Sequence, residues 1–178
     1  MKRSTLVAAA LAAVVFAAPA RSQGMLPFSV EARTGLAFPT GEFGDGLALG
    51  YGLGASAIFN VTPTLGVYGG YSYTQFDFDD DVFGDVDDTF DVQGFDAGAR
   101  LGLPMAGLSP YLRGGVVYYK AGDAGNELGF QVGAGLDYRL GPVVSFTPEV
   151  SYVTVPVGEG RGPDASFVRA DVGLRFRL

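Results

Sequence analysis

The sequence predicts an all-β protein, a closed eight-stranded antiparallel up-and-down transmembrane β-barrel. Three observations support this fold class. Apolar and polar residues alternate in eight segments, the aromatic members of the apolar set gather at both ends of the segments, and the charged members of the polar set are arginines and carboxylates without lysine. Alternation with a period of two gives each strand one apolar and one polar face. Eight strands of about ten residues each have the length of membrane-crossing β-strands.

The first 20 residues precede the barrel. Lys2 and Arg3 are followed by an apolar run that ends at Ala18. This pattern is typical of a secretory signal peptide, with cleavage after Ala20 or after Ser22. An uncleaved anchor is the alternative, but the run is short and rich in alanine. We expect residues 1–20 to be removed and residues 25–178 to form the barrel domain.

The composition argues against several classes of function. The net charge of −7 becomes −9 once Lys2 and Arg3 are removed, and a chain this acidic is a poor nucleic-acid binder. Cysteine is absent, so no disulfide framework is possible. Histidine is also absent, which rules out a Ser–His or Cys–His catalytic arrangement. We therefore expect no enzymatic activity, no cofactor and no nucleic-acid partner.

The eight strands differ in how clearly they alternate. The first places Glu31 and Arg33 on its polar face, the second to fifth carry glycine there together with small polar, tyrosine and charged residues, and the sixth alternates most cleanly. The seventh contains Pro148, which cannot donate to a sheet ladder, so we expect a bulge or a break. The eighth is the C-terminal "SFVRADVGLRFRL". The predicted strands cover residues 28–38, 47–60, 65–74, 95–103, 112–119, 130–140, 144–152 and 168–178.

Long and short connections alternate between these segments. The odd ones run roughly 8 to 15 residues and the even ones roughly 3 to 5. The third is an acidic stretch, residues 79–93, and the fifth is "AGDAGNEL". We expect the long connections at one end of the barrel and the short ones at the other.

Alternation alone allows either a soluble barrel with its apolar face inside or a membrane barrel with that face outside. The positions of the aromatic residues favour the membrane barrel, because two aromatic girdles at the lipid–water interfaces flank an aliphatic band in such proteins. The girdle near the short connections would contain Phe28, Phe59, Tyr138, Phe146 and Phe176, and the girdle near the long ones Phe38, Tyr73, Phe95, Tyr118, Phe130 and Tyr152.

The polar face supports the same choice, because arginine is favoured over lysine in enclosed ion pairs with carboxylates. The predicted lumen network consists of Glu31, Arg33, Asp96, Arg100, Arg113, Asp137, Arg139, Glu149, Arg169, Asp171 and Arg175. These charges could line a narrow ion pathway. They could also plug the bore, which in an eight-stranded barrel is only about as wide as its side chains. We expect plugging.

The pattern and the closing strand "FVRADVGLRFRL" resemble the small OmpA/OmpX-like outer-membrane β-barrels over residues 25–178. That resemblance implies export to the outer membrane, contact with lipid and lipopolysaccharide, and a C-terminal signal read by the barrel-assembly machinery. The signal here is Phe176 and Leu178, although such signals usually end in an aromatic residue. We expect a monomer with a structural or surface-interaction role, with a small-solute or ion channel as the alternative and adhesion as a third option.

The acidic stretch is also a candidate metal site. Closely spaced aspartates supply the oxygen ligands that Ca²⁺ prefers, but the spacing is not that of an EF-hand loop. A solvated loop is the simpler interpretation. The candidate ligands are Asp79, Asp80, Asp81, Asp85, Asp87 and Asp88.

Overall fold

The computed structural model describes residues 28–78, 89–121, 125–156 and 164–178, and these form one curved sheet. A short 3₁₀ helix, η1 (Gly41–Asp45), follows the first strand. The strands are β1 (Phe28–Pro39), β2 (Gly50–Asn60), β3 (Leu65–Asp77), β4 (Thr89–Gly102), β5 (Leu108–Ala121), β6 (Asn126–Arg139), β7 (Val144–Phe146), β8 (Glu149–Val155) and β9 (Ala165–Arg177).

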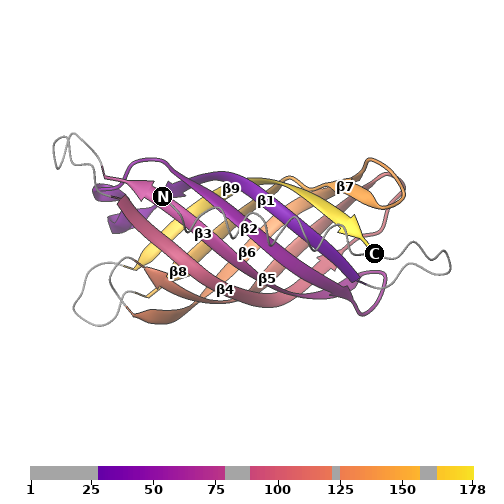
Figure 1. The fold of residues 1–178 in the computed structure, drawn as a ribbon, viewed down its shortest axis with the longest axis horizontal. Coiled ribbons are helices and arrows are strands. Elements are labelled where there is room, and N and C mark those ends of the chain that lie inside the picture. The colour runs from indigo at the N-terminus through magenta and orange to yellow at the C-terminus, as the bar shows by residue number, and fades with distance from the viewer. Residues whose placement is uncertain (1–27, 79–88, 122–124, 157–163) are drawn as a thin grey trace, which may run out of the picture.

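The sheet closes on itself. From β1 to β6 each strand pairs antiparallel with the next, β7 and β8 each pair with β6 and β9, and β9 pairs with β1, so no edge is left open. Both β7 and β8 lie between β6 and β9 and are two halves of one barrel strand. The predicted eight-stranded antiparallel barrel is confirmed, and Figure 1 shows it from the side. Within the described ranges, no helix is long and apolar enough to cross a membrane.

The barrel has a proximal and a distal end. The proximal end is where β1 begins and β9 ends, and it carries the connections 61–64, 103–107 and 140–143. The distal end is where β1 ends and η1 lies. In Figure 1 the proximal end is on the right, beside the C-terminus.

The predicted break at Pro148 is confirmed. Thr147 and Gly173 exchange backbone hydrogen bonds of 2.9 and 3.1 Å across to β9, so the ladder continues on that side. On the other side the Pro148 carbonyl accepts from the Leu136 amide at 3.0 Å. Proline has no N–H to return, and the strand is therefore divided into β7 and β8.

The strands extend further at the distal end than predicted. Asp77 pairs with Thr89 and Lys120 with Asn126, so parts of the expected third and fifth connections belong to β4 and β6. Only residues 122–125 separate β5 from β6, and the expected alternation of long and short connections is wrong there. Backbone pairing of a hairpin does not need apolar side chains, so the ladder continues where the alternation has faded.

The second strand, in contrast, starts later than predicted. It begins at Gly50, and Leu47 forms an isolated bridge with Phe78 instead of joining the barrel wall. Leu47 is buried at 9% exposure, whereas Leu49 and Leu53 are exposed on the outer face. The prediction that the second strand begins at residue 47 is wrong, because the chain turns inward before β2.

The barrel wall has an apolar outside and a largely polar inside. Valine, leucine, phenylalanine and tyrosine side chains along β1 to β9 are exposed on the outer face, for example Leu53, Val116 and Val132 at 52 to 54%. The buried side chains of the middle and proximal bore include the charged residues of six strands. This arrangement is the reverse of a soluble barrel and matches a wall solvated by lipid.

Candidate functional site

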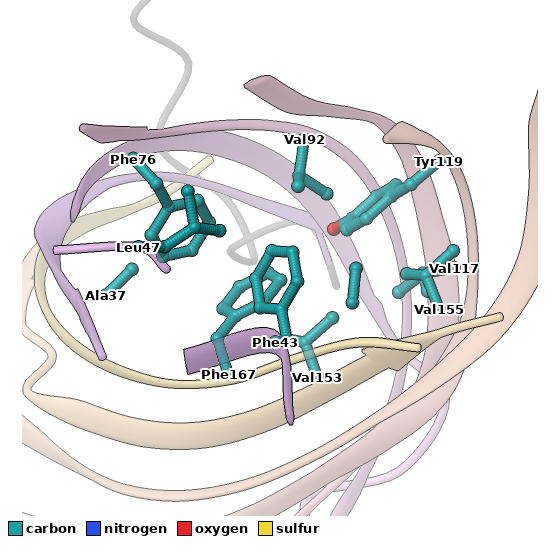
Figure 2. Packing of buried hydrophobic residues seen from close by; sticks show 11 residues of the cluster. Ala37, Phe43, Leu47, Phe76, Val92, Val117, Tyr119, Val153, Val155 and Phe167 are labelled. Carbon is teal, nitrogen blue, oxygen red and sulfur yellow. The ribbon is translucent and has the colours of Figure 1, made fainter. Parts of the chain in front are cut away.

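The bore of the barrel is the candidate site, and its distal third is apolar. Phe43 of η1 is buried and makes edge-to-face contacts with Phe76 and Phe90, with ring centroids 5.5 and 5.4 Å apart. Phe76 in turn contacts Phe167 at 5.3 Å. The complete cluster comprises Ala37, Phe43, Leu47, Phe76, Val92, Val117, Tyr119, Val153, Val155, Ala165 and Phe167. Figure 2 shows these side chains pointing toward one another inside the ring of strands, where they fill the distal bore.

On the proximal side of this cluster, a group of charges spans the bore. Arg113 of β5 contacts Glu31 of β1 at 3.2 Å, Glu149 of β8 at 3.5 Å and Asp96 of β4 at 3.7 Å. Arg33 lies 3.6 Å from Asp96 and 3.9 Å from Glu31. Because β1 and β5 are not neighbours in the sheet, the Arg113–Glu31 contact crosses the interior. All five side chains are buried.

Arg169 and Asp171 form a separate ion pair on β9. The Arg169 Nε donates to the Asp171 Oδ2 at 3.0 Å, and both side chains are buried. The two residues are one repeat of the strand apart and therefore share the inner face.

A third group surrounds Asp137 at the proximal end. Its carboxylate lies 2.8 Å from Arg175, 3.0 Å from Arg177 and 3.5 Å from Arg100. Arg175 also donates to Ser29 and Asn60 at 3.2 Å, and Arg177 donates to the Ser145 hydroxyl at 2.7 Å. Arg177 was not among the residues predicted in this network, although it shares the parity of Arg175.

Ten of the eleven residues expected in the lumen are buried on the inner face, and Arg139 is not. Arg139 is the last residue of β6, and its side chain is exposed at the barrel mouth. The prediction that Arg139 belongs to a buried network is therefore wrong. Parity selects the face of a strand but not the position along the barrel axis. Arg139 is exposed because it lies at the proximal end, where the wall ends at the turn 140–143.

Two tyrosines complete the polar interior. The Arg113 guanidinium lies 3.9 Å from the centroid of the Tyr68 ring, and that of Arg100 lies 3.6 Å from the Tyr111 ring. Tyr111 donates to Glu149 at 2.9 Å, and Gln131 donates to Tyr68 at 2.8 Å. Such cation–π contacts are strongest where water is excluded. Inward parity was the signal that could have placed both rings here.

Glycines on facing strands make room for these rings. A Cβ added at Gly115 would lie 2.7 Å from the Tyr68 hydroxyl, and one added at Gly135 would lie 2.5 Å from Tyr111 Cζ. A larger residue at Gly135 would displace the Tyr111 ring, and one at Gly115 would also meet the Ala97 carbonyl oxygen, 2.2 Å from the added Cβ. The abundance of glycine on the inner face is therefore explained in part by the space that the tyrosines occupy.

The proximal bore opens into a hollow of about 470 Å³. Arg100, Arg139, Arg175 and Arg177 line it, together with Asp137. The exposed turn residues around Pro63 and Pro104 form its rim. The hollow therefore lies between the Asp137 group and solvent.

The predicted girdle residues all have outward, exposed or half-buried side chains. Near the proximal end, Phe28 pairs with Phe59 and Tyr138 with Phe146. Farther toward the distal end, Phe95 pairs with Tyr118, and its ring packs edge-on against Tyr71 at 5.3 Å. The outward residues that the sequence argument did not assign to a girdle include Tyr51 and Tyr71.

The distal tyrosines form hydrogen bonds through their hydroxyl groups. Tyr51 donates to Gln75 and Tyr71 to Gln93, both at 2.8 Å. Tyr73 donates to Asp91 at 2.9 Å. Tyrosine with an apolar body and a hydrogen-bonded tip is typical of the membrane–water interface.

The predicted C-terminal assembly signal lies in the described part of the chain, whereas the candidate metal ligands do not. In the closing strand, Phe176 pairs with Val30, and the Leu178 amide donates to the Phe28 carbonyl at 3.0 Å, so the chain's last residues complete the β1–β9 seam. The candidate metal ligands Asp79, Asp80, Asp81, Asp85, Asp87 and Asp88 lie outside the described residues, as do residues 1–20.

Comparisons with known proteins agree with this geometry. The family model of the outer membrane protein beta-barrel domain matches residues 7–176. No curated protein sequence is similar enough to this chain to be matched.

Solved structures show the same fold at low sequence identity. Neisserial surface protein A is 18% identical, with a TM-score of 0.68, and the match covers 88% of this chain and 100% of that one. OprG from Pseudomonas aeruginosa is 14% identical, with a TM-score of 0.57 and coverage of 89% and 99%. Ail, the attachment invasion locus protein of Yersinia pestis, is 18% identical, with a TM-score of 0.54 and coverage of 86% and 100%.

Proposed function

Because this chain belongs to the outer membrane protein beta-barrel family and is a bacterial outer-membrane protein, we propose that it is a non-conducting barrel with a structural or surface-interaction role. The same fold hosts many activities, so the role has to be argued from the bore and the outer surface. We place the proximal end in the periplasm and the distal end at the cell surface. The barrel is monomeric and non-catalytic in this proposal.

The observation that carries the proposal is the filling of the bore at two heights. Arg113 reaches across the interior to Glu31, and the two side chains are only 2 to 3% exposed. The apolar cluster around Phe43 and Phe76 occupies the bore on their distal side. A hydrated ion would have to displace both layers, and breaking a buried ion pair typically costs about 3–5 kcal/mol.

The outer surface supports an interaction with lipid and lipopolysaccharide. Tyr51, Tyr71 and Tyr73 extend outward near the distal end, and each donates a hydrogen bond to a neighbouring side chain. This hydrogen-bonded aromatic belt would lie at the level of headgroups and sugars. During biogenesis, the barrel-assembly machinery would read Phe176 and Leu178 at the end of β9.

Single-channel recording in planar bilayers tests the proposal. The folded protein is first incorporated into vesicles, and flotation with protease protection verifies its insertion before fusion with the bilayer. We expect no steady open level, whereas a trimeric porin added to the same bilayer should give discrete conductance steps. A reproducible unitary conductance of the verified protein would instead favour the narrow-channel alternative.

A further inference from the structure

Positive charge is concentrated at the proximal end of the bore. The hollow there is lined by four arginines, Arg100, Arg139, Arg175 and Arg177, and by one carboxylate, Asp137. These side chains carry a formal net charge of +3, although the whole chain carries −7. The acidic partners of the other described arginines lie closer to the distal end, around Arg113 and Arg169.

Asp137 cannot neutralise this cluster alone. It is contacted by Arg100, Arg175 and Arg177, and the Arg100 contact is long at 3.5 Å. The Arg139 side chain is exposed and has no ion pair among the residues that the structure describes. Each guanidinium has five N–H donors, so donor capacity remains after the contacts to Asp137 are made.

Three of the four arginines are held in place before any ligand arrives. Arg100 stacks on the Tyr111 ring at 3.6 Å, and Arg175 donates to both Ser29 and Asn60. Arg177 is fixed by Ser145 at 2.7 Å. Preorganised donors lose less entropy on binding than mobile ones.

We propose that the hollow is a binding site for a small soluble oligoanion of the phosphate class, with the charge of a pyrophosphate group. A planar guanidinium group can donate two parallel hydrogen bonds to a pair of phosphate oxygens, and several guanidinium groups line this hollow. A volume of about 470 Å³ lies within the range of small-molecule sites. The inference goes beyond the proposed function, because a non-conducting barrel needs no ligand.

The position of the hollow favours a soluble ligand over a phospholipid headgroup. Arg100, Asp137 and Arg175 are buried on the inner face, whereas lipid contacts the outer face of the wall. The rim consists of exposed turn residues such as Pro63 and Pro104. An anion in the aqueous phase can enter along the barrel axis, but a headgroup would have to leave the membrane plane and cross the rim.

Calorimetric titration with sodium pyrophosphate tests the site. The folded protein is placed in phosphatidylcholine nanodiscs at low salt, and the variant Arg139→Ala is compared with the matched control Lys120→Ala. Both side chains are exposed, but Lys120 lies near the distal end of β5. We expect saturable binding by the parent protein, about tenfold weaker binding by Arg139→Ala, and binding within about twofold of the parent by Lys120→Ala.

Three outcomes would overturn the proposal. One is an absence of saturable heat with the parent protein in its folded state, as checked by circular dichroism. Another is an equal loss of affinity in the two variants, which would indicate nonspecific attraction. The third is binding that disappears in nanodiscs containing phosphatidylglycerol, since a headgroup would then occupy the hollow. None of these outcomes bears on conductance, so the two proposals fail independently.

Discussion

Arg113 joins three carboxylates from three different strands. Its guanidinium contacts Glu31, Asp96 and Glu149, donates to the Ser56 hydroxyl at 2.9 Å and lies over the Tyr68 ring. Removing it would take from the buried Glu149 its ion-pair partner and would leave Glu31 and Asp96 with their ion-pair contacts to Arg33. Arg139, in contrast, is exposed at the mouth of the barrel. The two residues are thus a matched test of whether the interior charges are enclosed.

We predict that Arg113→Ala lowers the free energy of unfolding by about 3–5 kcal/mol, because it leaves the buried Glu149 carboxylate without its ion-pair partner. Arg139→Ala should change it by less than about 0.5 kcal/mol, as surface substitutions usually do. Urea unfolding from lipid vesicles, followed by far-ultraviolet circular dichroism, measures both. Equal effects of the two substitutions would mean that water screens the interior charges.

The sequence predicted the face of each charged residue but not its position along the barrel axis. Parity placed Glu31, Arg33, Asp96 and Asp171 inside, where the structure has them. The same parity applied to Arg139 and was misleading, because a residue at the end of a strand can face inward and still reach solvent. Ion-pair partners could not be predicted either, since a contact such as Arg113–Glu31 depends on which strands face each other across the bore.

At the scale of the element, η1 is a small structure with a large packing role. It places Phe43 against Phe76 and Phe90, while the neighbouring Glu42 stays exposed. The phenylalanine side chain closes the distal bore from the loop side. The apolar cluster that results is as much a part of the interior as the ion pairs below it.

We predict that Phe43→Ala destabilises the folded barrel by about 3 kcal/mol, since it leaves a cavity in the apolar cluster. Glu42→Ala should be close to neutral because that side chain is exposed. Midpoints and slopes of urea unfolding in the same vesicles give the comparison. A Phe43 variant as stable as the Glu42 variant would show that the distal cluster is not packed.

The central parts of the strands could be predicted from the sequence, and their distal parts could not. Between the interfaces the outer residues must be apolar, so alternation marks the strand; beyond the interfaces Thr89 and Asn126 still pair in the ladder without that constraint. Phe43 gave no signal, because it belongs to a connection with no period of its own. Leu47 gave a misleading signal, because it continues the alternation of β2 although it lies outside that strand. Pro148 was informative since its missing N–H has the same consequence in any sheet.

At the scale of the whole molecule, the barrel is an inverted protein with hydrocarbon as the solvent of its outer face. Leu53, Val116 and Val132 are exposed on that face, whereas Glu31 and Arg113 are buried inside. Closure of β1 on β9 satisfies the backbone without an open edge, which is the condition for crossing a bilayer. The structural role proposed above requires both the lipid-facing wall and the filled bore.

Val132 gives the most direct test of this inside-out arrangement, because it lies near the middle of β6 with its side chain 53% exposed. The measurement is the free energy of unfolding from phospholipid vesicles for Val132→Arg, with Val132→Leu as the control. If lipid surrounds the wall, the arginine variant should lose about 2–4 kcal/mol and the leucine variant almost nothing. If Val132→Arg were as stable as Val132→Leu, water would be the solvent of the outer face, and the account would be contradicted.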